Sequence, residues 1–250
     1  MPPPDTALKT VKLTVITDFV CVSCCIGQHE LLDAINYCKD TLDLPLNFEL
    51  EHIPFRLINT TILPENCPNK PDREDFLSKF VGKERFSTLQ TNVSKWGEEK
   101  GRPLSLHGTI RQTTKAHRLA LKAGKLGGQS LQTPLIMAIF TASMEEGQDV
   151  AEPEVLADIA AKCGVMSRED ALAFLESDEL AKEVEDMSNA ARAKGITGVP
   201  VVVIDGKWAV TGGQSSEVYV QIFKKLSTCH GNGPCTNAGP LPPGMVETCV

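Results

Sequence analysis

The chain has 250 residues, of which 42% are hydrophobic and 23% charged, and its formal net charge at pH 7 is -7. This length and composition are typical of a globular protein that buries a sizeable core. The acidic balance excludes a nucleic-acid backbone as the main partner, because no basic stripe is available to displace counterions. No stretch reaches the apolar length of a membrane-spanning helix, so no membrane partner is expected either.

The chain is predicted to begin with a strand, a helix and a second strand. Residues 11–20, VKLTVITDFV, are rich in β-branched residues, which is typical of a buried strand. Helical spacing of apolar residues follows over residues 25–40, so Cys21 is expected in a turn between a strand and a helix. Residues 44–55 alternate apolar and polar side chains and predict a second strand, which ends at Pro54.

Residues 58–195 have a different pattern, which predicts an all-helical segment. Pro153 near the start of one helix and Gly164 just past its end show the expected asymmetry. Ser167 followed by Asp170 favours the start of another. The predicted helical segments are residues 71–101, 113–124, 130–147, 152–164, 167–177 and 180–195.

Strands return after this helical segment. Residues 201–204 and 208–210 are joined by Asp205 and Gly206, a pair that favours a type I′ turn, so they predict a hairpin. A closing helix is expected over residues 215–226.

Ser215 or Ser216 is the predicted N-cap of that closing helix. Residues 228–250 are dense in Gly and Pro and show no periodicity, which predicts a flexible tail.

This order of elements predicts an α/β fold of the thioredoxin-like type, interrupted by a large all-helical insertion. The thioredoxin-like domain is expected over residues 10–57 and 196–227, and the insertion over residues 58–195. A C-x-x-C pair beside a β-α-β pattern is the usual sequence mark of a thioredoxin-like redox site.

Cys21 and Cys24 supply that pair, and Cys25 follows without a gap. A thiol attacks a disulfide only as a thiolate, which a helix N-terminus stabilises. We therefore predict that Cys21 is the exposed nucleophile and that Cys24, one turn further on, resolves the mixed disulfide. Cys25 points about 100° away on a helix, so it is expected to pack in the core or, alternatively, to act as an accessory thiol.

Two other interpretations of the cysteines remain open. They could be structural thiols, or half of a zinc site, to which the tail could add Cys229, His230 or Cys235. Cys229 and Cys235 enclose a short Gly- and Pro-rich loop and are also candidate accessory thiols that could form a disulfide. We predict the redox role and no metal.

Pro200 stands directly before a predicted strand, where proline removes a donor from the hydrogen-bond ladder. A cis Val199–Pro200 peptide bond would explain this position. Thioredoxin-like folds hold such a proline against the C-x-x-C turn, so Val199 and Pro200 are predicted to position the substrate backbone.

Four stretches resemble the DsbA-like family, and specifically its FrnE-like subgroup: DFVCVSCCIG, AHRLALKAG, MEEGQDVAEPEVLADIAAKCGV and ARAKGITGVPVVVIDGKWAVTGGQSSEV. The resemblance extends over residues 10–227. That subgroup is related to 2-hydroxychromene-2-carboxylate isomerase and to the kappa-class glutathione transferases. The resemblance implies a thioredoxin fold interrupted by a helical domain, with His117 facing the active-site cleft.

The glutathione-using relatives carry a G-x-D-R-like turn before the last helix. This chain has Gly213, Gln214, Ser215 and Ser216 there, so the acidic anchor for a glutathione amino group is missing. Backbone N–H groups at that helix start could still hold a carboxylate. Gln214 and Ser215 are therefore predicted to bind substrate, with glutathione as a candidate co-substrate and no tightly bound cofactor.

The main prediction is a thiol–disulfide oxidoreductase of the DsbA/FrnE type that acts on protein or small-molecule disulfides, with a homodimer as a candidate assembly. Nine cysteines without a secretion signal indicate the cytoplasm. The family's usual string is C-P-W-C-Y-x-G, from which Val22, Ser23 and Cys25 depart, so the direction of electron flow stays open.

Two further hypotheses stay open beside this one. One is an isomerase or glutathione-dependent transferase on the same fold, acting on a small molecule such as a polyketide or another product of secondary metabolism. The other is a non-catalytic zinc- or thiol-binding protein.

Overall fold

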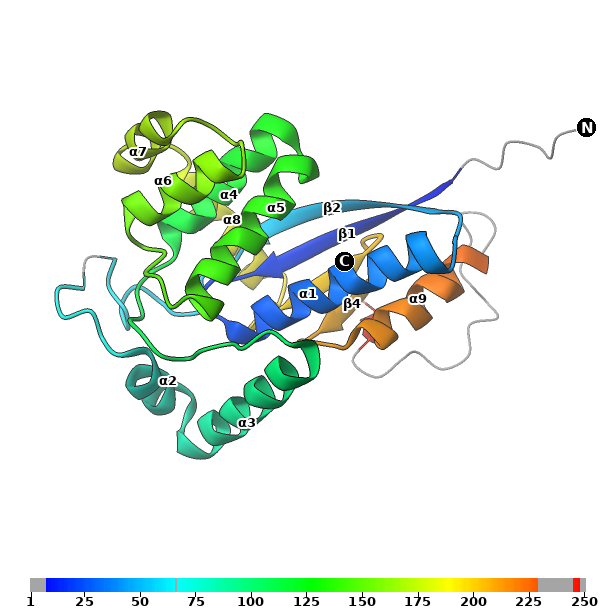
Figure 1. The fold of residues 1–250 in the computed structure, drawn as a ribbon, viewed down its shortest axis with the longest axis horizontal. Coiled ribbons are helices and arrows are strands. Elements are labelled where there is room, and N and C mark those ends of the chain that lie inside the picture. Colours follow the sequence, from blue (N-terminus) through cyan, green and yellow to red (C-terminus); the bar gives the residue numbers. More distant parts are fainter. Residues whose placement is uncertain (1–7, 66, 229–244, 248–250) are drawn as a thin grey trace, which may run out of the picture.

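A computed structural model describes residues 8–65, 67–228 and 245–247. Within them, five strands form one sheet in the order β2-β1-β3-β4-β5 (Figure 1). The strands are β1 (Lys9–Thr17), β2 (Leu46–Pro54), β3 (Val201–Ile204), β4 (Trp208–Thr211) and β5 (Met245–Glu247). β1 and β2 are parallel, and every other neighbouring pair is antiparallel.

Alternate residues of β1 face opposite sides of this sheet. Val11, Leu13 and Val15 face helices α1 (Val22–Asn36) and α9 (Ser216–Thr228) in one apolar cluster. Ile16 belongs to a second cluster on the other side, with Ala191 of helix α8 (Ala181–Ala193). Both faces of β1 are therefore covered, which holds its C-terminal end in place where the cysteines follow.

The remaining helices lie between β2 and β3 in the sequence, as predicted for the insertion. They are α2 (Arg73–Val81), α3 (Lys83–Lys100), α4 (Thr114–Gly127), α5 (Gln129–Phe140), α6 (Pro153–Lys162) and α7 (Arg168–Glu176). Two π-helical turns, Tyr37–Thr41 and Thr141–Glu145, extend α1 and α5. Helices α4 to α8 gather at one end of the sheet, whereas α2 and α3 project separately from the body (Figure 1). We call residues 73–100 the α2–α3 arm.

The local sequence predictions in this region are largely confirmed. Pro153 lies in the first turn of α6, and Ser167 caps α7 by accepting a hydrogen bond from Asp170 N. Gly101 ends α3 in the left-handed conformation. The predicted helix over residues 71–101 is wrong in one respect, because Gly82, with φ 91°, divides it into α2 and α3.

The hairpin between β3 and β4 is also confirmed. Asp205 and Gly206 both have positive φ, 50° and 68°, which is the combination that a type I′ turn requires.

The predicted tail over residues 228–250 needs two corrections. Thr228 still belongs to α9, and Met245–Glu247 pairs with β4 as the fifth strand of the sheet. A three-residue strand beside Gly and Pro is too short to show a period of two, so the sequence pattern could not reveal it. Cys229, His230 and Cys235 lie outside the described residues.

Candidate active site

The C-x-x-C pair lies where β1 passes into α1. Cys21 is the N-cap residue of α1 in extended conformation, and its carbonyl accepts hydrogen bonds from the Cys24 and Cys25 amides at 3.0 and 3.3 Å. Its own amide donates to the Asp18 carbonyl at 3.1 Å. Cys21 is half-buried, whereas Cys24 is only 1% exposed. Of these two thiols, a partner can therefore reach Cys21, which is the arrangement that the predicted roles require.

Cys24 is held in its protonated form. Burial raises the pKa of the Cys24 thiol well above its ordinary value, and the neighbouring Cys21 sulfur raises it further. The Asp18 backbone and the Thr17 hydroxyl act in the opposite direction, because both favour the thiolate. Cys24 is thus suited to react only after Cys21 has brought a disulfide to it.

Cys25 packs in the same apolar cluster as Cys24. It is fully buried in the core, and burial together with the negative charge of Glu145 raises the pKa of its thiol to about 12. A thiol with such a pKa is almost entirely protonated at neutral pH, so the placement favours the packing role over the accessory one.

Val199 and Pro200 lie against the cysteine turn. The Val199–Pro200 peptide bond is cis, as the sequence predicted. The Cys21 thiol donates to the Val199 carbonyl at 3.6 Å. A side chain added at Gly27 of α1 would meet the Pro200 ring, with its Cβ 3.2 Å from the Pro200 Cγ. Glycine at this position therefore lets the proline loop approach the first turns of α1.

The turn before α9 packs against α1 at Gly213, where an added Cβ would lie 3.2 Å from the Ser23 carbonyl oxygen. The next residue, Gln214, is half-buried, and its amide donates to Thr211 O at 2.8 Å. Ser215 is exposed. Gln214 and Ser215 directly follow Gly213, which packs against Ser23 of the cysteine turn, so both lie near this turn. Their role in substrate binding stays a prediction.

His117 does not face an open cleft, contrary to what the family resemblance implied. Its side chain is 2% exposed, its ring packs on Phe19 with the centroids 4.8 Å apart, and its Nε2 lies 3.2 Å from Asp18 Oδ1. At this burial His117 has no surface to offer a substrate directly.

Asp18 is the site residue that the sequence analysis missed. Its two carboxylate oxygens accept hydrogen bonds from Val20 N, Leu57 N, Thr113 Oγ1 and the His117 ring. Burial would raise the pKa of this carboxyl, but the contacts with His117, Thr113 and Leu57 outweigh it and leave the pKa below its usual value. An aspartate at the end of an apolar strand, three positions before Cys21, is a sequence mark that could have revealed it.

A family model for the DSBA-like thioredoxin domain matches residues 12–224. The chain belongs to this family. The match confirms both the DsbA-like resemblance and the predicted thioredoxin-like fold with its helical insertion. The FrnE-like subgroup stays a prediction, and among curated proteins no sequence relative matches the chain.

Solved structures agree with the DsbA-like assignment. A probable DsbA oxidoreductase from Streptomyces coelicolor has a TM-score of 0.71 at 20% identity, over 94% of this chain and 98% of that chain. A 2-hydroxychromene-2-carboxylate isomerase has a TM-score of 0.59 at 15% identity, over 86% and 94%. The cytosolic disulfide reductase DsbM from Pseudomonas aeruginosa has 0.56 at 16%, over 87% and 100%. At these identities, the likeness shows a shared fold.

Glu30 of this DsbA-like protein occupies the N-terminus of α9, the helix start that was considered as a site for a ligand carboxylate. Glu30 is 3% exposed, and its Oε2 accepts from Ser216 N of α9 at 2.7 Å. Its Oε1 accepts from Trp96 Nε1 at 2.6 Å and from Lys100 Nζ at 2.9 Å. Although burial would raise the pKa of Glu30, the hydrogen bonds from Lys100, Trp96 and Ser216 lower it. One carboxylate therefore joins α1, α9 and the α2–α3 arm.

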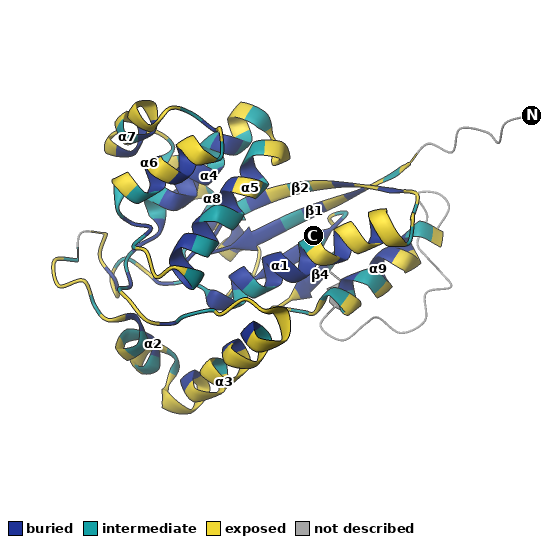
Figure 2. Ribbon diagram, in the orientation of Figure 1, coloured by how far each residue is buried: buried dark blue, intermediate teal, exposed yellow. Residues whose placement is uncertain are grey.

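Replacing Glu30 by alanine is expected to lower the free energy of unfolding by about 2 kcal/mol, because buried donors lose their acceptor. The change should also loosen the α2–α3 arm, since only three of the 18 residues of α3 are buried (Figure 2). Limited proteolysis should then cut residues 82–101 faster than in the original protein. Asp33→Ala is the matched control, because Asp33 is exposed and also faces Lys100, at 3.6 Å. Equal cleavage in both variants would contradict the role of Glu30.

The described residues of this DsbA-like chain contain no group of side chains that is ready to bind a metal ion. Within residues 8–65, 67–228 and 245–247, no three His, Cys, Asp or Glu side chains are grouped so as to hold a metal ion. The same residues contain no helix with the length and apolar character of a membrane span. The tail residues of the zinc hypothesis lie outside them, so that hypothesis stays untested.

Proposed function

We propose that this protein is a thiol–disulfide oxidoreductase in which Cys21 attacks and Cys24 resolves. The observation that carries the proposal is the placement of the two thiols at the start of α1. Cys21 is half-buried at the N-terminus of the helix and touches the Val199 carbonyl, while Cys24 is buried one turn further on. Membership in the DsbA-like family, which includes oxidoreductases, supports the same chemistry.

In the first step, the Cys21 thiolate attacks one sulfur of a substrate disulfide. The substrate S–S bond breaks, and the other substrate sulfur leaves with the electron pair and takes a proton from solvent. In the second step, Cys24 loses its proton to solvent and attacks the Cys21 sulfur, which releases the rest of the substrate as a thiolate. The substrate gains two electrons, and the Cys21–Cys24 pair is oxidised to a disulfide. The same steps in reverse oxidise a substrate dithiol.

Val199 would support this reaction through its backbone carbonyl, which lies beside Cys21. Its carbonyl accepts from the Cys21 thiol in the free protein, and this contact is lost once Cys21 is bonded to a substrate sulfur. The carbonyl can then accept from a backbone N–H of the substrate. Val199 and Pro200 would thus hold an extended substrate segment across the cysteine turn.

We further propose that the protein acts on thiol or disulfide substrates in a reducing compartment such as the cytoplasm. Glutathione would be the small-molecule partner that reduces the Cys21–Cys24 disulfide back to the dithiol. Nine cysteines in the chain support this assignment. DsbM from Pseudomonas aeruginosa is a cytosolic disulfide reductase and has been solved with GSH, at a TM-score of 0.52 and 16% identity. Glutathione would act here as a co-substrate that reacts at Cys21.

The test is a trapping experiment with Cys24→Ser. The variants are made in a chain in which Cys67, Cys163, Cys229, Cys235 and Cys249 are replaced by alanine, because these thiols can also react with oxidised glutathione. Without the resolving thiol, the mixed disulfide on Cys21 has no internal route of release, so incubation with oxidised glutathione should leave one stable adduct. Intact-mass spectrometry and peptide mapping should place it on Cys21. Cys25→Ser is the matched control and should accumulate no adduct, because its resolving thiol is intact.

Absence of an adduct on Cys21 in the Cys24→Ser protein would overturn the proposal. Small-molecule isomerase or transferase activity that survives the double change Cys21→Ser and Cys24→Ser would support the alternative enzyme on this fold instead. Stoichiometric zinc in the purified protein, lost with Cys21, would support the zinc-binding alternative.

A further inference from the structure

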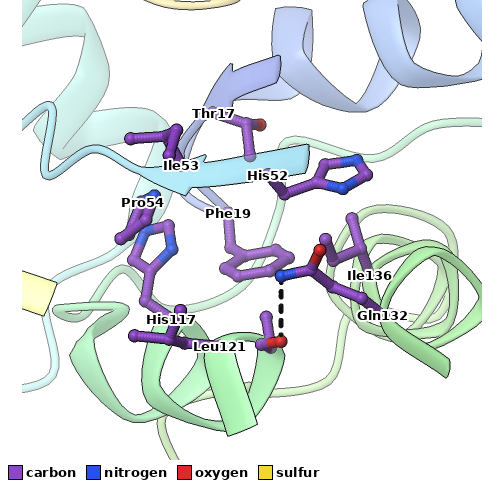
Figure 3. A pocket seen from close by; sticks show the side chains of 10 residues that line it. Thr17, Phe19, His52, Ile53, Pro54, His117, Leu121, Gln132 and Ile136 are labelled. Atoms are coloured by element: carbon purple, nitrogen blue, oxygen red, sulfur yellow. Dashed lines mark hydrogen bonds between the residues drawn. The ribbon is translucent and has the colours of Figure 1, made fainter. Parts of the chain in front are cut away.

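A small chamber lies at the C-terminal ends of β1 and β2, enclosed by helices α4 and α5 (Figure 3). Thr17 and His52 reach it from the two strands, and His117 and Gln132 reach it from the two helices, around the ring of Phe19. It has room for about one water molecule. We call this cavity the Thr17–His52 chamber.

Two polar atoms at this chamber are left without a partner. Thr17 Oγ1 and His52 Nδ1 make no hydrogen bond within the part of the chain that the structure describes. Thr17 is 3% exposed and His52 is 4% exposed, so neither atom has access to bulk solvent. Buried polar atoms of native proteins are nearly always satisfied, by protein or by ordered water. The chamber is therefore built for a polar occupant.

The hydrogen bond at His52 Nε2 determines whether the occupant of the chamber donates to Nδ1 or accepts from it. His52 Nε2 lies 3.1 Å from Gln28 Oε1, and an amide oxygen can only accept, so Nε2 carries the ring proton. Burial lowers the pKa of His52 to about 4, so the ring is neutral at physiological pH. The polar side chain of Gln132 acts in the opposite direction and raises this pKa, but burial has the larger effect. Nδ1 is then an acceptor, and the occupant must donate to it.

The register of the strands brings Thr17 within reach of the same occupant. Val15 pairs with His52 and Thr17 pairs with Pro54, so Thr17 and His52 are diagonal neighbours on one face of the sheet. Both side chains also line the same cavity, which has room for about one water molecule, so a single water can contact both. Such a water donates one proton to His52 Nδ1 and the other to Thr17 Oγ1.

With its lone pair occupied by that water, the Thr17 hydroxyl can donate its own proton elsewhere. Thr17 follows Val15 by two positions and so lies on the face of β1 that α1 covers, and Cys24 is a buried thiol in the first turn of α1. A hydrogen bond from the Thr17 hydroxyl favours the thiolate form of Cys24. The other ionisable groups around this region are Cys21, His52 and the buried pair of His117 with Asp18.

We propose that the Thr17–His52 chamber binds one water molecule, which orients the Thr17 hydroxyl so that it donates a hydrogen bond to the Cys24 sulfur when this becomes a thiolate. The inference rests on the proposed function, in which Cys24 resolves the mixed disulfide. Thr17 and His52 act through Cys24, so they are positioning residues. The proton that Cys24 loses leaves to solvent, and the new bond joins the Cys24 and Cys21 sulfurs as the substrate thiolate departs.

The experiment isolates the resolving step by loading Cys21 with the chromophoric thiol 2-nitro-5-thiobenzoate as a mixed disulfide. The full chain is used with Cys67, Cys163, Cys229, Cys235 and Cys249 replaced by alanine, so that these thiols do not compete. Attack by Cys24 releases the chromophore, and the pH profile of the release rate reports the ionisation of Cys24. The variants compared are Thr17→Val, Thr17→Ser and His52→Leu.

Thr17→Val keeps the shape of threonine but removes the donor, so the midpoint of its profile should rise by about one pH unit, with release at pH 7 about tenfold slower. Thr17→Ser keeps the hydroxyl and should behave as the original protein does, whereas His52→Leu should shift the midpoint in the same direction as Thr17→Val. Unchanged profiles in Thr17→Val and His52→Leu would overturn the inference.

Failure of the proposed function would look different. If the unsubstituted Thr17 protein releases no chromophore, or if Cys24→Ser releases it just as fast, then Cys24 is not the resolving thiol. A change in rate without a change in the pH midpoint would show that Thr17 only maintains the packing of the strand, which would also contradict the hydrogen-bond chain.

Discussion

Replacing Cys21 by serine is expected to lower the rate of disulfide exchange by at least about 10³-fold, because a serine hydroxyl is not ionised at neutral pH and does not attack a disulfide. The neighbouring thiols cannot take over, since Cys24 is 1% exposed and Cys25 is fully buried. The measurement is the reduction of a mixed disulfide between glutathione and a peptide, coupled to glutathione and glutathione reductase.

Cys163→Ser is the matched control for this prediction. Cys163 is also half-buried and ends a helix, at the C-cap of α6, but it lies outside the candidate site. This variant should keep the original rate. Comparable loss in both variants would show that the assay responds to general thiol content, and full activity in Cys21→Ser would remove Cys21 as the nucleophile.

Replacing Asp18 by alanine should have the largest effect on stability, a loss of about 3–5 kcal/mol in the free energy of unfolding, because it leaves the buried His117 and several buried donors without their acceptor. Denaturant unfolding followed by circular dichroism measures this loss. Asp186→Ala is the control: this aspartate also forms an ion pair, with Lys182, but on the surface. Its effect should stay below about 0.5 kcal/mol.

The same carboxylate predicts a pH dependence. The pKa of Asp18 is lower in the folded protein than its ordinary value of 3.8. A carboxyl with a depressed folded pKa stabilises the fold fully above the unfolded pKa, and this contribution is lost as the pH falls through the folded pKa. The difference in stability between the original protein and Asp18→Ala should therefore be constant near neutral pH and shrink below pH 3.8. A difference that shrinks toward alkaline pH instead would contradict this assignment.

The sequence predicted those parts of the site that depend on local patterns. The C-x-x-C spacing, the strand before it and the helix after it all lie within a short stretch. The position of Pro200 directly before a strand indicated its cis peptide bond. The division of the helix at Gly82 was missed, because helical periodicity continues on both sides of a single glycine.

The buried polar contacts could not be predicted in this way, since each joins residues far apart in the chain. Asp18 and His117 are 99 positions apart, and Glu30 and Ser216 are 186 apart. The stretches that contain these residues do not show which of them meet, so only the packing of the folded chain reveals each pair. His117 illustrates the difference: the family resemblance drew attention to it, but its hydrogen bond with Asp18 explains its place.

The four contacts of Asp18 also limit how the protein can be shortened. Leu57 follows the second strand, Thr113 and His117 belong to the helical insertion, and Val20 belongs to the cysteine turn, yet all four meet one carboxylate. A minimal thioredoxin-sized version, made by joining residue 57 directly to residue 196, would strip this carboxylate of its partners from the insertion. The thioredoxin-like domain and the helical insertion occupy separate ranges of the sequence, but they share the contacts of Asp18. A variant designed around the cysteine turn therefore has to keep the insertion.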